Sequence, residues 1–466
     1  MLRRTQSLCP VCLRRLDAVY EQAPDGAAVL LRKRCPEHGA FSVPVWREPQ
    51  KGGPSTPAFA DWSRPKAPSY PARPATSIAG GCPFDCGLCP AHAQHTCTGL
   101  VEVTLRCNMA CPVCYAVAGA EAVAGDPPPA VVAAQLDALR QASGPCNVQI
   151  SGGEPTVRDD LPAILSLARQ RGFGLVQLNT NGLRLAEDPE YAARLRAAGL
   201  DSVYLQWDGA REASFLSLRG RECLAFKRRA VEHCARAGLG VVLVATVVRG
   251  VNSDELGELL RLALRLGPAV RGLHLQPAAF FGRYPWRLEQ APRLTLPEVM
   301  GALAQQAPEL FSPGHVHPPG CEHELCSFSA VYRRTERQGA PALEPLGQAA
   351  CCAPAPQAPF APPPAAEGAR QSRRFTALHW KGSGPAPTPS GRESAAADGF
   401  SRFLAEAGAE RRFTLSAMAF QDALSLDVDR VRGCCIHVAR PDGRLIPFCL
   451  HNITSADGTR LYGDGR

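Results

Sequence analysis

Three cysteines stand close together just after an apolar strand pattern at Leu100–Thr104. They are Cys107, Cys111 and Cys114, in the run Leu-Arg-Cys-Asn-Met-Ala-Cys-Pro-Val-Cys-Tyr-Ala. At this C-x3-C-x2-C spacing, three thiolates can hold three irons of a cubane cluster and leave the fourth iron without a protein ligand. A cluster that only transfers electrons normally takes four cysteines. The spacing therefore predicts a cluster with one open iron, where a cofactor can bind; a zinc knuckle is the alternative.

A second motif supports the open-iron interpretation. The turn Ser151-Gly-Gly-Glu-Pro-Thr156 follows Asn147–Ile150, which has the pattern of a short buried strand. Glycines allow the backbone to approach a ligand closely, and the carboxylate of Glu154 can accept a hydrogen bond from an ammonium group. The turn alone is a weak signal, but downstream of the cysteine triad it is a strong one.

Together the two motifs resemble the radical S-adenosylmethionine (SAM) superfamily. In that superfamily the open iron chelates the methionine amino and carboxylate groups, and an electron from the cluster splits the sulfonium to give a 5′-deoxyadenosyl radical. The resemblance implies that the Gly-Gly-Glu-Pro turn contacts the SAM amino group and that residues 179–182 contact the carboxylate and ribose. Many members carry an aromatic residue just before the third cysteine; here that position is Val113, and Tyr115 follows the cysteine.

Residues 100–282 alternate between apolar runs and helical patterns such as Ala130–Gln141 and Cys223–Ala237. Six β/α units predict an α/β fold with a parallel sheet and right-handed crossovers, which matches the partial (β/α)6 barrel of radical SAM enzymes. The predicted strands are Val101–Leu105, Asn147–Ile150, Gly174–Leu178, Ser202–Trp207, Val241–Val247 and Leu273–Gln276.

In parallel β/α folds, chemistry occurs at the carboxyl ends of the strands. Polar residues follow most of the predicted strands, although each of them except Glu154 can equally be a loop cap. The cofactor-binding candidates are Gly152, Gly153, Glu154, Asn179, Asn181 and Asp208, and the further polar residues at strand ends are Thr246, Asn252 and Gln276.

Residues 1–50 form a small unit with two knuckles on either side of a predicted hairpin at Val29–Arg32. Cys9 and Cys12 make a C-x2-C pair, and Cys35 and His38 make a C-x2-H pair. The four are a credible ligand set for one zinc or iron ion in a zinc-ribbon or rubredoxin-like knuckle, although His38 can instead be a simple turn residue. Residues 51–81 are rich in proline and predict a linker.

The other cysteines predict two auxiliary iron–sulfur clusters. Residues 82–99 contain a second C-x3-C-x2-C triad with a fourth cysteine behind it, and four cysteines close a cluster. The predicted ligands there are Cys82, Cys86, Cys89 and Cys97. Near the C-terminus a Pro-Asp-Gly turn returns Cys449 toward the adjacent pair of cysteines. The predicted ligands of this second cluster are Cys321, Cys326, Cys449 and one of Cys434 and Cys435, with Cys435 as the candidate; several of them can instead be buried free thiols.

These motifs divide the chain. We expect the radical SAM core at 100–300, auxiliary-cluster regions at 301–350 and 396–466, and a low-complexity linker at 351–395. Twenty cysteines at short spacings indicate metal sites rather than disulfides, and without a signal-peptide pattern they predict a cytoplasmic protein. The net charge of +8 comes with spread-out arginines, which predicts no nucleic-acid partner but is compatible with peripheral contact to an anionic membrane.

The order of motifs along the chain is similar to the archaeal tetraether synthase group and its bacterial relatives, the pterin methyltransferase-like radical SAM proteins. The similarity includes Gly81–Cys89, Phe413–Asp422 and Pro441–Cys449 and leaves out the two proline-rich stretches. It implies three iron–sulfur clusters, one mononuclear metal, and a low-potential electron donor such as ferredoxin or flavodoxin.

The similarity also implies a function: hydrogen abstraction from an unactivated carbon and coupling of lipid alkyl chains. The aromatic run Phe280–Trp286 then forms an apolar mouth, unless it only packs the open side of the barrel. Two alternatives stay open. One is methylation of a pterin or another small heterocycle. The other is a non-catalytic iron–sulfur or zinc protein that transfers electrons or binds a partner, which would need neither an open iron nor Glu154.

Replacing Cys107, Cys111 and Cys114 together by alanine should abolish formation of 5′-deoxyadenosine from SAM in the reduced protein. Each substitution removes an iron ligand, so iron and sulfide should fall by about one cluster. Chromatography of the nucleoside products and metal analysis measure both effects. The matched control replaces Cys82, Cys86 and Cys89; if that variant loses SAM cleavage and the first does not, the catalytic assignment belongs to the upstream triad.

Overall fold

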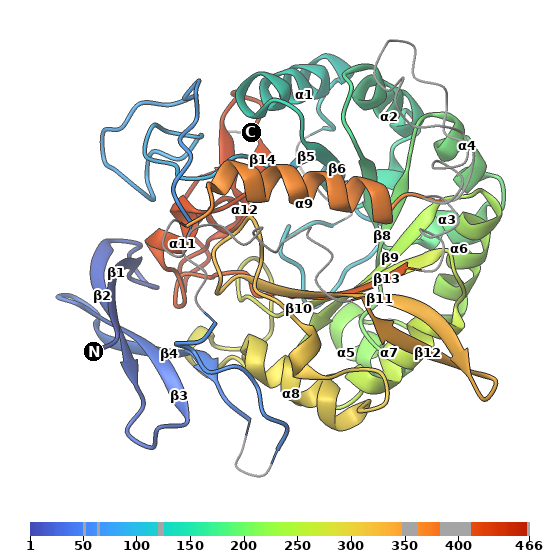
Figure 1. Ribbon diagram of the computed structural model, residues 1–466. Coiled ribbons are helices and arrows are strands. Elements are labelled where there is room, and N and C mark those ends of the chain that lie inside the picture. The colour runs from blue at the N-terminus through green and yellow to red at the C-terminus, as the bar shows by residue number, and fades with distance from the viewer. Residues whose placement is uncertain (50–52, 63–65, 120–124, 347–361, 383–411, 464–466) are drawn as a thin grey trace.

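The computed structural model describes residues 1–49, 53–62, 66–119, 125–346, 362–382 and 412–463. These residues form two sheets, a four-stranded sheet at the N-terminus and an eleven-stranded sheet in the rest of the chain. The smaller sheet lies to one side of the larger unit (Figure 1).

The small sheet is an antiparallel meander in the order β1-β2-β3-β4. Its strands are β1 (Arg3–Leu8), β2 (Arg15–Gln22), β3 (Ala28–Cys35) and β4 (Gly39–Arg47). Side chains alternate between buried and exposed along β2 and β3, as expected for a sheet with one face on a core. Tyr20 and Trp46 are fully buried on that face. The connections β1–β2 and β3–β4 carry the two predicted knuckles, which therefore lie at the same end of the sheet.

The large sheet has the six predicted strands at its centre, all parallel and in sequence order. They are β5 (Thr98–Thr104), β6 (Asn147–Gly152), β7 (Val176–Thr180), β8 (Ser202–Gln206), β9 (Gly240–Val247) and β10 (Val270–Pro277). The apolar runs therefore mark real strands, with ends displaced by at most a few residues. The α/β prediction is confirmed.

The C-terminal part of the chain extends this sheet at both edges, which the sequence did not indicate. At one edge β13 (Arg412–Met418) is parallel to β10 and is followed by the antiparallel strands β11 (Ser327–Arg337) and β12 (Ala340–Pro345). At the other edge β14 (Ile436–Ala439) is parallel to β5 and pairs with β15 (Leu445–Pro447). Segments far apart in sequence thus border the same barrel.

Helices cover the outer face of the parallel sheet (Figure 1). They bury one apolar side each; α7, for example, buries Leu256, Leu259, Leu260 and Ala263. The helices between and after the core strands are α1 (Pro129–Ser143), α2 (Leu161–Gln170), α3 (Leu183–Glu187), α4 (Tyr191–Ala197), α5 (Glu212–Arg219), α6 (Leu224–Arg236), α7 (Leu256–Arg265) and α8 (Leu296–Gln306), with α11 (Val428–Arg432) and α12 (Phe448–Asn452) near the C-terminus.

One helix falls inside the stretch predicted as a low-complexity linker. Residues Ala365–His379 form α9, which lies across the barrel in the view of Figure 1. It packs closely, because a Cβ on Gly368 would come within 1.8 Å of the carbonyl oxygen of Gly320. Composition alone did not predict this helix, because contacts with the barrel stabilise it. Cys351 and Cys352, in the same predicted linker, lie outside the described residues.

The N-terminal sheet docks on the loop before α11 through buried polar groups. Asp427 is fully buried and accepts hydrogen bonds from Arg3, Thr5 and the hydroxyl of Tyr20. Nearby, the ammonium of Lys33 donates to the hydroxyl of Ser7 at 2.8 Å and to two backbone carbonyls of residues 423 and 424 at 2.9 and 2.7 Å. Buried polar groups need such partners, so these bonds fix how the two sheets meet.

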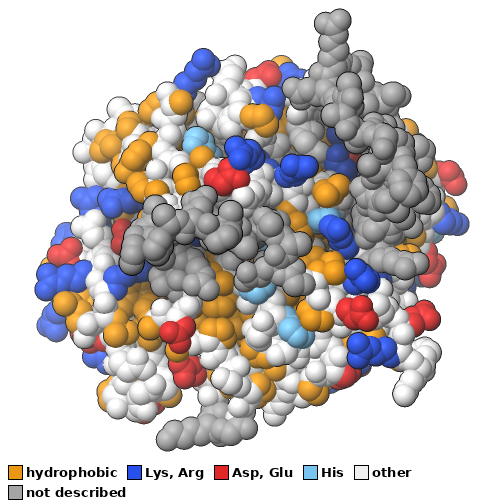
Figure 2. Space-filling view, viewed as in Figure 1, with side chains coloured by type: hydrophobic (Ala, Val, Ile, Leu, Met, Phe, Trp, Pro, Cys, Tyr) orange, Lys and Arg blue, Asp and Glu red, His pale blue; other side chains and the backbone are white. Residues whose placement is uncertain are grey.

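The exterior is mixed in charge. On the face shown in Figure 2, basic and acidic side chains are interspersed with hydrophobic ones over the described surface. Among the described residues, no helix combines the length and the apolar character needed to cross a bilayer.

Asp427→Asn should weaken the docking of the N-terminal sheet. The loss of a buried charge beside Arg3 should lower the free energy of unfolding by about 2 kcal/mol, and urea unfolding followed by tryptophan fluorescence can measure it, because Trp46 lies in this sheet. Asp429→Asn, whose carboxylate is 46% exposed, is the control and should cost well under half as much.

The same prediction has a pH dependence. Although burial opposes it, Arg3 and the hydrogen bonds hold the pKa of Asp427 below its usual value. Its stabilisation is therefore present above the unfolded pKa of about 4 and is lost as the pH falls through the folded pKa. The deficit of Asp427→Asn should shrink below about pH 4; a deficit that stays constant down to pH 2 would contradict the assignment.

Candidate active site

The cysteine triad and the Gly-Gly-Glu-Pro turn meet because β5 and β6 are neighbouring parallel strands. The amide of Gly153 donates to the carbonyl of Thr104 at 2.8 Å, and the amide of Glu154 donates to that of Arg106 at 2.9 Å. Gly152 has a φ of +132°, and a Cβ there would come within 2.2 Å of the Thr104 oxygen. Only glycine fits this close approach, which places the turn against the start of the triad loop.

Glu154 holds the turn to the next strand. Its Oε1 accepts from the amide and hydroxyl of Thr156, at 3.1 and 2.6 Å, and from the hydroxyl of Thr180 at 2.7 Å. Its Oε2 accepts from the amide of Asn181 at 2.7 Å. Burial raises the pKa of this carboxyl against the effect of these hydrogen bonds. Most acceptor positions are therefore used within the chain, and Oε2 retains room for one further donor on the cavity side.

Two arginines that the sequence did not single out hold the triad loop. Arg219, at the end of α5, donates to the carbonyl of Val113 at 2.8 Å and makes a bidentate ion pair with Asp208, with both N–O distances at 2.7 Å. Arg283, after β10, donates to the carbonyl of Cys111 at 2.8 Å. Bidentate guanidinium–carboxylate pairs fix geometry strongly, so this loop has a defined shape.

Asp208 does not lie at the cavity surface, where the sequence analysis predicted a cofactor contact. It is fully buried beneath the cavity wall and does not line the cavity, whereas Arg219 does. Burial would raise the pKa of Asp208, but the Arg219 guanidinium outweighs it and holds the pKa below the usual value. We therefore assign Asp208 the role of positioning Arg219 rather than of touching a cofactor directly.

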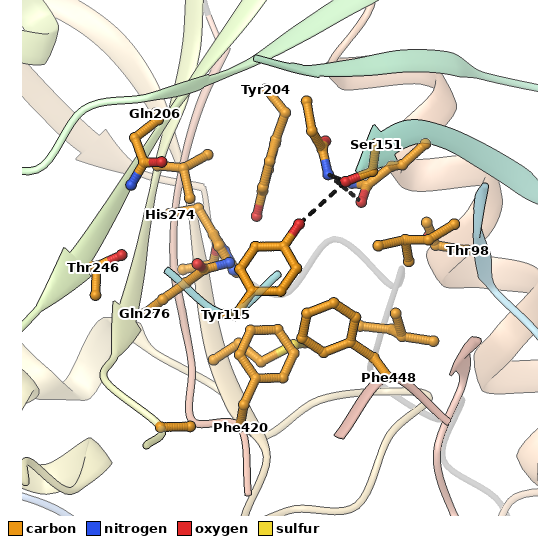
Figure 3. A pocket seen from close by; sticks show the side chains of 18 of the residues that line it. Thr98, Tyr115, Ser151, Tyr204, Gln206, Thr246, His274, Gln276, Phe420 and Phe448 are labelled. Carbon is orange, nitrogen blue, oxygen red and sulfur yellow. Dashed lines mark hydrogen bonds between the residues drawn. The ribbon is translucent and has the colours of Figure 1, made fainter. Parts of the chain in front are cut away.

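A cavity of about 380 Å³ opens beside the triad and runs through the barrel. Polar side chains from several strands point into it, together with aromatic rings (Figure 3). Asn179 and Asn181, both predicted cofactor contacts, line it; Asn179 donates to the hydroxyl of Ser151 at 3.2 Å, while its own Oδ1 is buried without a hydrogen-bond partner in the described structure. Such an orphan acceptor indicates a ligand donor.

Lys227 also lines the cavity, and the sequence analysis missed it. Its ammonium is buried and donates to the carbonyls of Asn181 and Gln206, at 2.9 and 2.5 Å, which leaves one of its three donors for a ligand. Its position in the sequence could have indicated that it is buried, because Lys227 lies on the same side of α6 as the buried residues Ala230, Val231 and Cys234. Burial lowers the pKa of Lys227 to about 8.

The predicted mononuclear site comes together in the N-terminal sheet. The ligand atoms of Cys9, Cys12, Cys35 and His38 all lie within 4.8 Å of one another. The Nδ1 atom of His38 is 3.4 Å from the sulfur of Cys35 and 3.6 Å from that of Cys9. A tetrahedral zinc site with about 2.3 Å bonds has ligand separations of about 3.8 Å, so the four residues fit one ion.

The structure divides the auxiliary cysteines differently from the prediction. Cys97 is not grouped with the upstream triad; its sulfur lies within 4.8 Å of those of Cys321 and Cys435. Cys326, Cys434 and Cys449 line a separate small cavity, which Cys435 also borders. Of the upstream cysteines, Cys82 and Cys86 lie in one hydrophobic cluster with C-terminal residues such as Leu426 and Leu450. The sequence could not give the first two of these sets, because each combines residues next to β11 with residues next to β14, and these two strands lie at opposite edges of the sheet.

The aromatic run after β10 serves two purposes. Phe281 and Tyr284 line the cavity. Phe280 is 1% exposed and packs edge-on against Tyr284 and Trp286, with ring centroids 5.5 and 5.8 Å apart. The predicted mouth is thus only partly formed by this run, and the rest of it packs the core.

Comparison with known proteins agrees with this geometry. Residues 101–263 match the radical SAM superfamily, and residues 1–47 match the HMPTM N-terminal zinc ribbon domain. The 7,8-dihydro-6-hydroxymethylpterin dimethyltransferase of Methanocaldococcus jannaschii is 31% identical over 97% of this chain and 94% of that protein. The chain belongs to the radical SAM superfamily, in the family of this dimethyltransferase.

Other proteins match a smaller share of the chain. The mycofactocin maturase MftC of Mycolicibacterium smegmatis is 32% identical over 38% of this chain and 44% of that protein. The solved structure of Streptococcus suis SuiB covers 41% of this chain and 42% of that one, with 13% identity and a TM-score of 0.35.

The residues present fit the cluster and the SAM that define radical SAM enzymes. Cys107, Cys111 and Cys114 are partly exposed, whereas Cys146, Cys223 and Cys234, which lie in the core, are buried. Beside the triad lie the unpartnered Oδ1 of Asn179 and the spare donor of Lys227. We propose that these two groups receive the amino and carboxylate ends of SAM, and that Glu154 and Asn181 hold the loop between them.

Lys227→Met should raise the KM for SAM by roughly ten- to a hundredfold, because a charge-assisted hydrogen bond to the carboxylate is lost. In the wild type the KM should also rise above about pH 8, where the free lysine loses its proton; the variant should lack this rise. Arg228→Met removes an exposed charge from the same helix and is the matched control. Equal KM values for the two variants would exclude a SAM contact by Lys227.

Proposed function

We propose that this protein is a radical SAM enzyme that methylates a small planar heterocycle of the pterin class. The observation that carries the proposal is a group of polar side chains that share the wall of the cavity with a larger apolar surface. Amide, imidazole and hydroxyl groups from β6, β8, β9, β10 and β13 face the space beside the triad (Figure 3), and these residues are Gln149, Tyr204, Gln206, Thr246, His274, Gln276 and Ser416.

Such a lining favours a polar substrate over alkyl chains. Burying a polar group against hydrocarbon without a partner costs about 1–3 kcal/mol for each group, so several such groups would oppose binding of two lipid tails. Burial lowers the pKa of His274 to about 4, so its imidazole is neutral at neutral pH. Its Nδ1 is 2.8 Å from the hydroxyl of Ser416, so its Nε2 is left to make one hydrogen bond, as donor or as acceptor, to the edge of a pterin.

Aromatic rings provide the other half of such a site. Tyr204 stacks on Trp380 with ring centroids 6.0 Å apart and an interplanar angle of 30°, and its ring is 5.7 Å from that of His274. Flat rings with polar edges suit a planar heterocycle, which can stack on them while its edge meets the amides. The pterin substrate in the name of the M. jannaschii relative is consistent with this arrangement.

The chain would contribute positioning and exclusion of water. When bound, the cluster and SAM supply a 5′-deoxyadenosyl radical for hydrogen abstraction. Cys107, Cys111 and Cys114 would hold the cluster, Lys227 and Asn179 would orient SAM, and the barrel walls would keep solvent from the reacting carbon. A low-potential electron donor is needed from outside the chain.

Lipid coupling is the second candidate, because one wall of the same cavity is apolar. Phe420 and Phe448 have ring centroids 4.6 Å apart, and Phe281 lies 6.3 Å from Phe448. This wall could take an alkyl chain, and it would be the part of the site that a lipid substrate uses.

The two candidate functions use different walls of the cavity to bind the substrate. Reduced, reconstituted protein with SAM and 7,8-dihydro-6-hydroxymethylpterin should give a product heavier by one or two methyl groups in mass spectrometry. S-adenosylhomocysteine should accompany it if a second SAM donates the methyl. Gln276→Leu should lower kcat/KM for the pterin by roughly tenfold or more, whereas Phe420→Leu should change it only two- to threefold.

Lipid coupling would give the opposite pattern. Dialkyl phospholipid would then accelerate SAM cleavage and pterin would not, Phe420→Leu would be the damaging variant, and Gln276→Leu would have little effect. Stimulation by lipid alone would overturn the proposed methylation.

A further inference from the structure

The helix α9 lies across the amino end of the barrel, at the starts of the strands (Figure 1). In the middle of the helix, the guanidinium of Arg373 donates to the carbonyl of Thr96, which precedes β5, at 3.1 Å. The carbonyl of Arg373 accepts from the side chain of Asn147, the first residue of β6, at 3.4 Å. Just past the helix, the amide of Gly382 donates to the carbonyl of Asp201, the residue before β8, at 3.3 Å. The helix therefore reaches from the amino end of β5 to that of β8.

One side of α9 faces the catalytic cavity. Ser372, Phe375, Thr376 and Trp380 line the cavity, and they follow one another along the helix at the spacings that place side chains on one side. Leu378 lies on another side of the helix and is 51% exposed. A helix outside the six β/α units thus supplies the floor of the cavity at its amino end.

Trp380 fills a level of the barrel that lacks a side chain. The strand register places Tyr204, Gly272 and Thr414 at the same level of the sheet. The indole of Trp380 stacks on Tyr204, and its Nε1 donates to the hydroxyl of Thr414 at 3.1 Å. Below this level, a Cβ on Gly240 would come within 2.2 Å of the carbonyl oxygen of Trp380. Because barrel interiors are filled by layers of side chains, the indole supplies the packing that Gly272 leaves out.

The backbone on both sides of Trp380 is fixed. On one side, the guanidinium of Arg412 is 2.9 Å from Nε2 of His379. On the other side, Nε of Arg271 donates to the carbonyl of Lys381 at 3.1 Å. The floor therefore has a defined depth. It lies about 13 Å below the level of Gln276, because the four steps of β10 from residue 272 to residue 276 each rise about 3.3 Å.

The chemistry of a pterin decides which of its edges meets this floor. In 7,8-dihydro-6-hydroxymethylpterin, every hydrogen on carbon belongs to C7 or to the hydroxymethyl group, and the pyrimidine ring at the other end has none. Hydrogen abstraction therefore requires the pyrazine end to point toward Cys107, Cys111 and Cys114. The pyrimidine edge, with its 2-amino group, then points toward Trp380.

We propose that Trp380 is a specificity-determining residue, whose indole limits the depth of the cavity and rejects pterins that carry a bulky group on the 2-amino nitrogen. This inference rests on the proposed methylation of a pterin. It assigns α9 a part in substrate choice that the six β/α units do not supply.

A matched pair of ligands tests the depth of the floor. Equilibrium dialysis measures how 7,8-dihydro-6-hydroxymethylpterin and its derivative with a benzyl group on the 2-amino nitrogen bind to the full chain, reconstituted without oxygen, with SAM and without reductant. The wild type should bind the benzyl derivative roughly ten- to a hundredfold more weakly, because the added ring overpacks the floor.

Trp380→Ala should bring the two dissociation constants to within about threefold of each other. Removing the indole leaves room for one ring, as a cavity of about 150 Å³ in a protein core holds benzene. Leu378→Ala shortens an exposed side chain of the same helix and is the control, which should keep the wild-type ratio. A purely structural role of Trp380 would weaken both ligands equally and would leave the ratio unchanged.

Trp380→Leu keeps more of the packing and is the second variant, so the test does not depend on the folding of Trp380→Ala. Its ratio should lie between those of the wild type and Trp380→Ala. A wild-type ratio in Trp380→Leu, or in a folded Trp380→Ala, would overturn the inference alone, and so would a wild type that binds both ligands equally. A wild type that binds neither pterin would overturn the proposed methylation and this inference with it.

Discussion

The close approach of two backbones at the carboxyl ends of β5 and β6 is the constraint on which the site depends. Gly152 and Gly153 leave no room for a side chain beside Thr104 and Arg106, and their hydrogen bonds join the turn directly to the start of the triad loop. From this junction Glu154 accepts hydrogen bonds from residues at the end of β7. Lys227 and Arg219 add further contacts around the cavity, to the carbonyls of Asn181 and Val113. A shift of the turn would therefore move every group that surrounds the cavity.

Buried charge is distributed in a consistent way around this junction. Asp208 neutralises Arg219 beneath the wall, so that the guanidinium can hold the triad loop without carrying a free charge into the barrel. Lys227 is held by carbonyl dipoles at 2.9 and 2.5 Å. Its hydrogen-bond partners are neutral, and Asp208, whose charge also acts on it, is paired with Arg219, so the buried ammonium gains from an anionic ligand. The unliganded site is therefore biased toward a carboxylate.

Periodicity was enough to predict the six core strands, and spacing singled out two motifs, the cysteine triad and the Gly-Gly-Glu-Pro turn, that meet in the structure, and four knuckle residues whose ligand atoms lie together. These features are local, because each depends on a few consecutive residues or on neighbouring β/α units. The missed features are products of long-range pairing. β13 and β14 join opposite edges of one sheet, so no short pattern reveals that Cys97 meets Cys435. Likewise Asp208 follows a strand as a ligand would, and only packing shows that Arg219 uses its carboxylate.

The docking of the first strands against the loop before α11 has a consequence for how the chain is made. A ribosome releases residues 1–47 early, yet their partner Asp427 and the edge strands β13 and β14 emerge last. Until then, Arg3, Tyr20 and Lys33 lack their buried partners, and both margins of the central sheet lie open. Unpaired sheet margins invite association between chains. Production of this protein should therefore be limited by completion of the last strands, and slower synthesis or chaperones that cover exposed sheet edges should raise the soluble yield.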